Sequence, residues 1–85
     1  MKVNTNKIVE GLLKESKVKK GFTKETFIDL AYDIDEYPEE YPTKESIIEY
    51  VTDLLNDSVD CSVCSESNAR HILSLIEETI EKFNQ

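Results

Sequence analysis

The sequence predicts an all-α domain, a compact bundle of four short helices. Apolar residues recur at intervals of three and four along most of the chain, which is the spacing of one helical face. Glycine and proline number only two each, too few for a sheet protein that turns about every eight to twelve residues. A chain of 85 residues forms one domain, so residues 1–85 are expected to share a single core.

No segment of the chain looks suited to a membrane or to export. The apolar runs are far shorter than the ~20 residues that span a bilayer. The N-terminal sequence MKVNTNKIVEGLL has neither an unbroken apolar stretch nor a small-residue cleavage site, so it does not resemble a signal peptide. We therefore expect a cytoplasmic protein whose two cysteines are reduced.

The first helix is predicted over residues 5–16. Asn4 or Thr5 can cap its N-terminus. Its apolar stripe consists of Ile8, Val9, Leu12 and Leu13. Gly11 lies in the middle of the helix, where glycine costs about 1 kcal/mol relative to alanine. This cost indicates either a close helix contact or simple tolerance, and the sequence leaves both explanations open.

The second helix is predicted over residues 23–35, after a lysine-rich link. Thr23 can accept hydrogen bonds from the first-turn amides, and Phe22 and Phe27 have the spacing of a hydrophobic staple around that cap. Its apolar stripe consists of Phe27, Leu30, Ala31 and Ile34. Pro38 disfavours helical backbone at the residue before it, so the helix should end ahead of this proline.

The third helix is predicted over residues 43–56 and the fourth over residues 66–83. Thr43 can cap the third helix, and Ser65 or Ser67 can cap the fourth. The segment SVDCSVCS between them lacks helical periodicity and is expected to be a link. The stripe of the third helix consists of Ile47, Ile48, Val51, Leu54 and Leu55. The stripe of the fourth consists of Ala69, Ile72, Leu73, Ile76, Ile80 and Phe83.

Charge is divided unevenly along the chain, whose formal net charge is −8. Residues 1–24 carry seven lysines and two glutamates, which gives +5. Residues 25–85 carry sixteen acidic and three basic residues, which gives −13. A basic patch for nucleic acid is therefore expected only near the N-terminus. Its members would be Lys14, Lys17, Lys19, Lys20 and Lys24.

An acidic turn with tyrosines, which we call the elbow (residues 35–41), separates the second and third predicted helices. Its candidate partner-binding residues are Asp35, Glu36, Tyr37, Glu39, Glu40 and Tyr41. Carboxylates among tyrosines suit a basic protein partner, because aromatic residues supply much of the binding energy of many interfaces. Two alternatives stay open: the carboxylates are simply solvated, and the tyrosines before Pro38 and Pro42 pack down the loop.

Cys61, Cys64 and His71 are the residues from which a metal site could be built. Two cysteines two residues apart can share a zinc ion, and His71 could supply a third ligand. A fourth ligand would have to be Asp60 or Glu66, an unusual choice for a structural site. A redox dithiol is the second alternative, although the strand-then-helix context of that motif is absent. We expect no metal and no cofactor, with the cysteines packed as small apolar residues.

One part of the chain, roughly residues 8–51, carries a combination of short motifs that resembles a known protein family. A helix containing L-A-x-D is followed by acidic residues, an aromatic–proline pair, and a helix with Tyr and a branched apolar residue. The residues concerned are Leu12, Leu13, Lys14, Leu30, Ala31, Asp33, Tyr37, Pro38, Ile47, Tyr50 and Val51. This combination resembles the YozE-type family of small bacterial proteins, which implies a sterile-alpha-motif-like (SAM-like) bundle without catalytic residues. The chain lacks the aromatics of that family's first helix and the tryptophan of its last helix.

These observations predict a small acidic protein-interaction module of bacterial or phage origin. No nucleophile elbow or phosphate-binding glycine loop is present, so we do not expect an enzyme. The expected partner is a protein with a basic surface, not nucleic acid or a membrane; the oligomeric state is not predicted. One alternative is a phage-type inhibitor of the anti-restriction or anti-CRISPR kind, whose carboxylates imitate nucleic-acid charge on a DNA-binding enzyme. A further alternative is nucleic-acid binding through the N-terminal lysines.

Overall fold

The computed structural model describes residues 2–84, and within that range the chain forms four α-helices and one short 3-10 helix. They are α1 (Thr5–Ser16), α2 (Gly21–Glu36), η1 (Pro38–Glu40), α3 (Lys44–Asp60) and α4 (Glu66–Phe83). The described residues contain no β-strand. The predicted all-α bundle of four helices is therefore confirmed.

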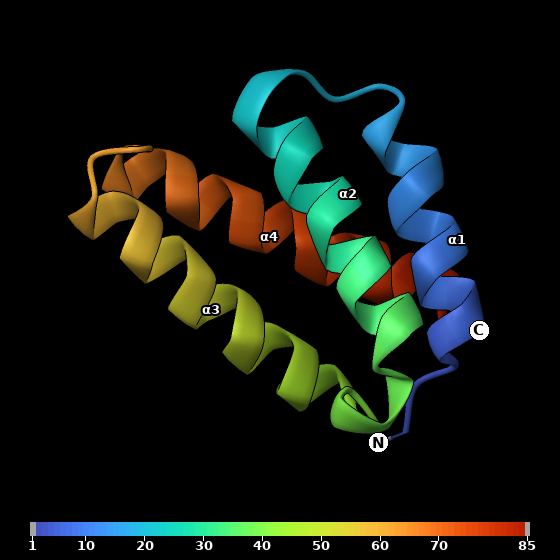
Figure 1. Ribbon diagram of the computed structural model, residues 1–85. Helices are drawn as coiled ribbons and strands as arrows, with labels where there is room; N and C mark the ends of the chain where they lie inside the picture. The colour runs from blue at the N-terminus through green and yellow to red at the C-terminus, as the bar shows by residue number, and fades with distance from the viewer. Residues whose placement is uncertain (1, 85) are drawn as a thin grey trace.

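The helices form two antiparallel pairs (Figure 1). In one pair α1 packs against α2, and in the other α3 packs against α4. α4 passes behind α2 in Figure 1 and also contacts α1, so this helix joins the two pairs. The resulting globule measures 33 × 24 × 20 Å.

One hydrophobic core receives residues from all four α-helices. Its buried members are Ile8, Leu12, Phe27, Leu30, Ala31, Ile34, Tyr41, Ile47, Val51, Leu55, Ala69, Ile72, Ile76 and Ile80. Apart from Tyr41, each of them belongs to a stripe that helical spacing predicts. The buried face of every helix therefore follows from the apolar pattern of the sequence.

Three predicted helix caps are present. The Asn4 side chain accepts a hydrogen bond from the N–H three residues ahead at 3.3 Å, and the Ser65 hydroxyl does the same at 3.1 Å. At the start of α3, Thr43 and Ser46 form a reciprocal capping box with distances of 3.1 and 3.2 Å. Each of these bonds satisfies a backbone N–H that no helical carbonyl reaches.

α2 begins at Gly21, two residues earlier than predicted. Gly21 has a φ of +59°, a conformation that glycine adopts at little cost. Thr23 consequently lies inside the first turn, and the residue before the helix, Lys20, makes no side-chain cap. The predicted cap at Thr23 is therefore wrong.

α3 continues to Asp60, four residues beyond its predicted end at Asn56. Val59 packs against the core, and the Ser58 hydroxyl donates a hydrogen bond to the Leu54 carbonyl at 3.0 Å. The predicted link thus begins only after Asp60, because packing of Val59 stabilises a turn that the local sequence does not favour.

A Schellman turn then ends α3. The N–H groups of Ser62 and Val63 donate to the carbonyls of Val59 and Ser58 at 3.0 and 2.8 Å. Ser62 has a φ of +60°. Glycine is the usual residue at this position, because a side chain is disfavoured at positive φ.

Gly11 is a contact point between α1 and α4. A methyl group placed on Gly11 would overlap the Cβ and ring carbons of Phe83. The Nζ atoms of Lys14 and Lys82 lie 6.0 and 5.2 Å from the centre of the same ring. Of the two explanations left open for Gly11, the structure therefore supports close helix contact.

Candidate functional site

The elbow places its carboxylates on the surface. All six residues from Asp35 to Glu40 are exposed. Two backbone hydrogen bonds, from Glu40 to the Tyr37 carbonyl at 3.0 Å and from Tyr41 to the Pro38 carbonyl at 3.1 Å, fold the chain into η1. Within residues 2–84, no ion pair joins any elbow carboxylate to a cation. Their negative charge is therefore available to a partner.

Tyr41 does not belong to that surface. Its side chain is only 7% exposed and its hydroxyl donates a hydrogen bond to the Asp33 carboxylate. Its ring meets the ring of Tyr50 edge to face, with centroids 5.4 Å apart and planes at 67°. Tyr41 is therefore a packing residue, unlike the exposed candidate partner-binding residues of the elbow.

Tyr41, Asp33 and Tyr50 form one cluster that connects α2, the elbow and α3. Burial, followed by the hydrogen bond to Asp33, raises the pKa of Tyr41 far above its ordinary value. Burial, followed by the nearby charge of Asp33, also raises the pKa of Tyr50. Both phenols are consequently held neutral next to the carboxylate, where they can act as donors.

The N-terminal segment fastens the far side of the elbow. Lys2 and Thr43 form an antiparallel bridge, and the Val3 N–H donates to the Pro42 carbonyl at 3.0 Å. The next residue, Asn4, donates its N–H to the Asn84 side chain at 2.9 Å. The end of the elbow is thus tied both to the start of the chain and, through it, to the end of α4.

Two exposed tyrosines accompany the elbow carboxylates. Tyr32 is 62% exposed and Tyr37 is 43% exposed. Tyr32 lies on α2 three and four residues before Asp35 and Glu36, so the three side chains share one helical face. We define the acidic surface as Tyr32, Asp35, Glu36, Tyr37, Glu39 and Glu40. The predicted set omitted Tyr32, although its helical spacing from the two acids could have identified it.

The predicted basic patch lies at the other end of α2. The turn that contains Lys17, Lys19 and Lys20 precedes α2, whereas the elbow follows it (Figure 1). At 1.5 Å per residue, a helix of this length separates the two by about 24 Å. The Lys19 Nζ lies 5.8 Å from the centre of the Phe27 ring. The two ends of α2 therefore differ in charge: the basic end is the lysine-rich turn before the helix, and the acidic end is the elbow after it.

The two cysteines lie in and beside the turn after α3. Cys61 is exposed, whereas Cys64 is half-buried and packs against the core; neither is in a disulfide. His71 is exposed on α4. Among the described residues, no three His, Cys, Asp or Glu side chains come together as a group that could hold a metal ion. Cys64 therefore packs as a small apolar residue, as expected, whereas Cys61 does not.

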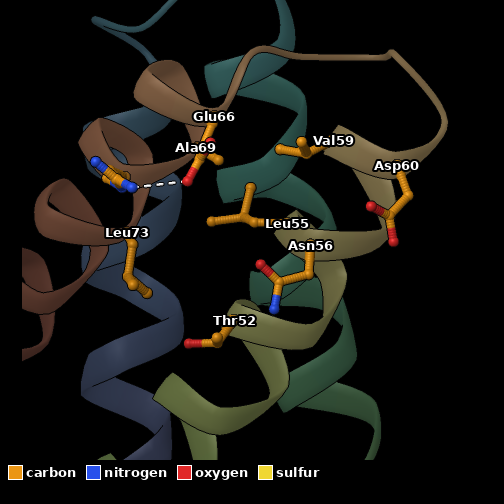
Figure 2. A pocket seen from close by; sticks show the side chains of 9 residues that line it. Thr52, Leu55, Asn56, Val59, Asp60, Glu66, Ala69 and Leu73 are labelled. Carbon is orange, nitrogen blue, oxygen red and sulfur yellow. Dashed lines mark hydrogen bonds and ion pairs between the residues drawn. The ribbon is translucent and has the colours of Figure 1, made fainter.

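A groove runs between the C-terminal half of α3 and the N-terminal half of α4 (Figure 2). Its volume is about 460 Å³. The apolar side chains that line it are Leu55, Val59, Ala69 and Leu73, and Asn56 and Asp60 stand at one edge. We call this feature the α3–α4 groove. The sequence did not predict it, because it depends on how the two helices diverge.

Comparison of the chain with protein-family models, with curated proteins and with solved structures gives no match in any of the three. The resemblance of residues 8–51 to the YozE-type family therefore stays a prediction. Within residues 2–84, every helix is too short or too polar to cross a bilayer.

Proposed function

We propose that this protein is a non-enzymatic interaction module whose acidic surface binds a basic surface on a protein partner. The observation that carries the proposal is that four exposed carboxylates, none of them in an ion pair within residues 2–84, stand beside two exposed tyrosines at the end of α2 and in the anchored turn that follows it. We also propose a cytoplasmic location and a bacterial or phage origin; a bacterial origin is what the family resemblance implies.

The anchoring of the elbow supports this proposal in physical terms. The Tyr41–Asp33 hydrogen bond and the Val3–Pro42 backbone bond hold the two sides of the turn. A loop that is already ordered loses less conformational entropy when it binds. Tyrosine adds apolar contact area at low entropic cost, and carboxylates accelerate encounter with a basic partner.

Charge reversal tests the proposal. The variant Asp35→Lys/Glu36→Lys/Glu39→Lys/Glu40→Lys should lose a partner that the wild-type protein captures from host extract. A control variant, Asp57→Lys/Glu78→Lys, reverses two exposed acids outside the acidic surface and should still capture that partner. If the wild-type protein and the fourfold variant capture the partner equally well, the acidic surface does not bind it.

Two further assays separate the two nucleic-acid alternatives, one a competition with duplex DNA and the other a gel shift. If the partner is a DNA-binding enzyme and duplex DNA displaces it, the acidic surface acts by imitating phosphate charge. If the protein itself shifts duplex DNA in a gel at low salt, and Lys17→Glu/Lys20→Glu abolishes the shift, the basic end is the binding site. Because electrostatic binding to DNA weakens steeply with salt, both assays are repeated across a salt series.

A further inference from the structure

The α3–α4 groove has an apolar floor framed by two helices. Leu55 and Ala69 are buried at its base, and Val59 and Leu73 are half-buried beside them. On each helix the lining residues are spaced by three and four, so that two helical turns of α3 face two turns of α4. A groove of this form suits the apolar face of a third helix.

Charge distinguishes the two edges of the groove. Asn56 and Asp60 line the groove on the α3 side, and Glu49 and Asp53 continue the same helical stripe toward the start of α3. All four residues are exposed. Within the described part of the chain, none of the three carboxylates forms an ion pair. The α3 edge is therefore negative.

The α4 edge is neutralised within the protein. Arg70 donates to the Glu66 carboxylate at 2.7 Å, one turn apart on the same helix (Figure 2). A ligand in the groove would therefore face negative charge along α3, and along α4 a carboxylate already paired with Arg70. Charge complementarity requires positive side chains on the flank that faces α3.

We propose that the α3–α4 groove binds an amphipathic helix of a partner protein, with an apolar stripe on the groove floor and lysine or arginine along the flank facing α3. This site is separate from the acidic surface, so it adds a second docking site to the module. The apolar stripe would place residues at i, i+3, i+4 and i+7 against the floor.

The test uses a synthetic helical peptide with leucine at i, i+3, i+4 and i+7 and lysine on one flank. Every floor residue carries a methyl group, so methyl-labelled protein reports binding directly. The peptide should shift the methyl resonances of Leu55, Val59, Ala69 and Leu73. The same peptide with glutamate for lysine should bind at least about tenfold more weakly, because like charges then meet along α3. Equal binding by the two peptides would overturn the proposal.

Two matched pairs of variants locate the site. Asn56→Trp fills the groove from its edge and should weaken the lysine peptide about tenfold, whereas Asn6→Trp on the exposed face of α1 should leave binding unchanged. Asp53→Asn/Asp60→Asn should weaken binding about threefold to tenfold and reduce its salt dependence. Asp57→Asn, which lies off the stripe of α3 that carries Asp53 and Asp60, should neither weaken binding nor change its salt dependence.

The outcomes for the two docking sites are distinguishable. Glu39→Lys/Glu40→Lys should bind the lysine peptide as the wild-type protein does, because the elbow lies outside the groove. Shifts confined to residues 32–40, or full binding by Asn56→Trp, would overturn the groove proposal and leave the acidic surface untouched. Each variant is first compared with the wild-type protein by thermal unfolding. Only variants that remain folded are then used to measure a loss of binding.

Discussion

The hydroxyl of Tyr41 donates a hydrogen bond to the carboxylate of Asp33, which lies in the last turn of α2. This bond joins the elbow to the helix that precedes it. Both partners are shielded from water, Tyr41 almost completely and Asp33 partly. The bond is therefore expected to contribute to stability and to hold the acidic surface in place.

Tyr41→Phe should lower the free energy of unfolding by about 1–2 kcal/mol, because it removes a hydrogen bond to a charged, half-buried acceptor and keeps the ring. Tyr41→Ala also removes the ring that packs on Tyr50 and should cost about 3–5 kcal/mol. Urea unfolding measures both values. Tyr37→Phe is the control, since Tyr37 is exposed. If Tyr41→Phe matches the wild-type protein, the bond does not stabilise the elbow.

Alkaline pH should destabilise the protein through Tyr41 and Tyr50, whose pKa values are raised above the ordinary 10.0 in the folded state. The unfolded tyrosines then ionise at lower pH than the folded ones. Their contribution to stability is therefore complete below about pH 10 and is lost as the pH rises above it. Urea unfolding at about pH 8 and about pH 11 measures the loss, and Tyr41→Phe should show a smaller one. An unchanged pH dependence in that variant would contradict the role of Tyr41.

Gly11→Ala should destabilise the protein by about 1–3 kcal/mol, because the new methyl group overlaps Phe83. The sign is informative, since the same change in an uncrowded helix would stabilise it by about 1 kcal/mol. In a double-mutant cycle with Phe83→Ala, the cost of Gly11→Ala should disappear. Additive costs in that cycle would show that the contact with Phe83 is not the cause.

Ser62→Gly should raise the free energy of unfolding by about 0.5–1 kcal/mol, because Ser62 ends α3 at a φ of +60°. Ser62→Ala is the contrasting variant, since alanine keeps the Cβ that positive φ disfavours and should bring no gain. Thermal unfolding compares the three proteins. A stabilising alanine would mean that loss of the hydroxyl, and not backbone conformation, produces the effect.

Local patterns in the sequence were sufficient to predict the helical stripes and three caps. Ile8, Ile47 and Ile76 are buried where spacing places them, and Asn4 and Thr43 cap the helices that follow them. These features depend on residues within one or two turns. The exposure of the elbow carboxylates also followed from local composition.

Features that depend on distant residues could not be predicted in this way. The burial of Tyr41 requires Asp33 and Tyr50 to arrive from two different helices. The contact of Gly11 with Phe83 joins opposite ends of the chain. The last turn of α3 depends on packing of Val59, which its polar neighbours do not indicate. In each case the local sequence is compatible with two structures, and tertiary packing determines which of them forms.

The most direct test of the acidic surface is a titration of ¹⁵N-labelled protein with the basic partner that it captures. Amide resonances of residues 32–40 should shift most, and the shifts should weaken as salt is raised, because exposed charges are screened. Resonances of the lysine-rich turn, at the opposite end of α2, should stay in place. Shifts that centre on that turn or on the α3–α4 groove, with residues 32–40 unaffected, would contradict the proposed function.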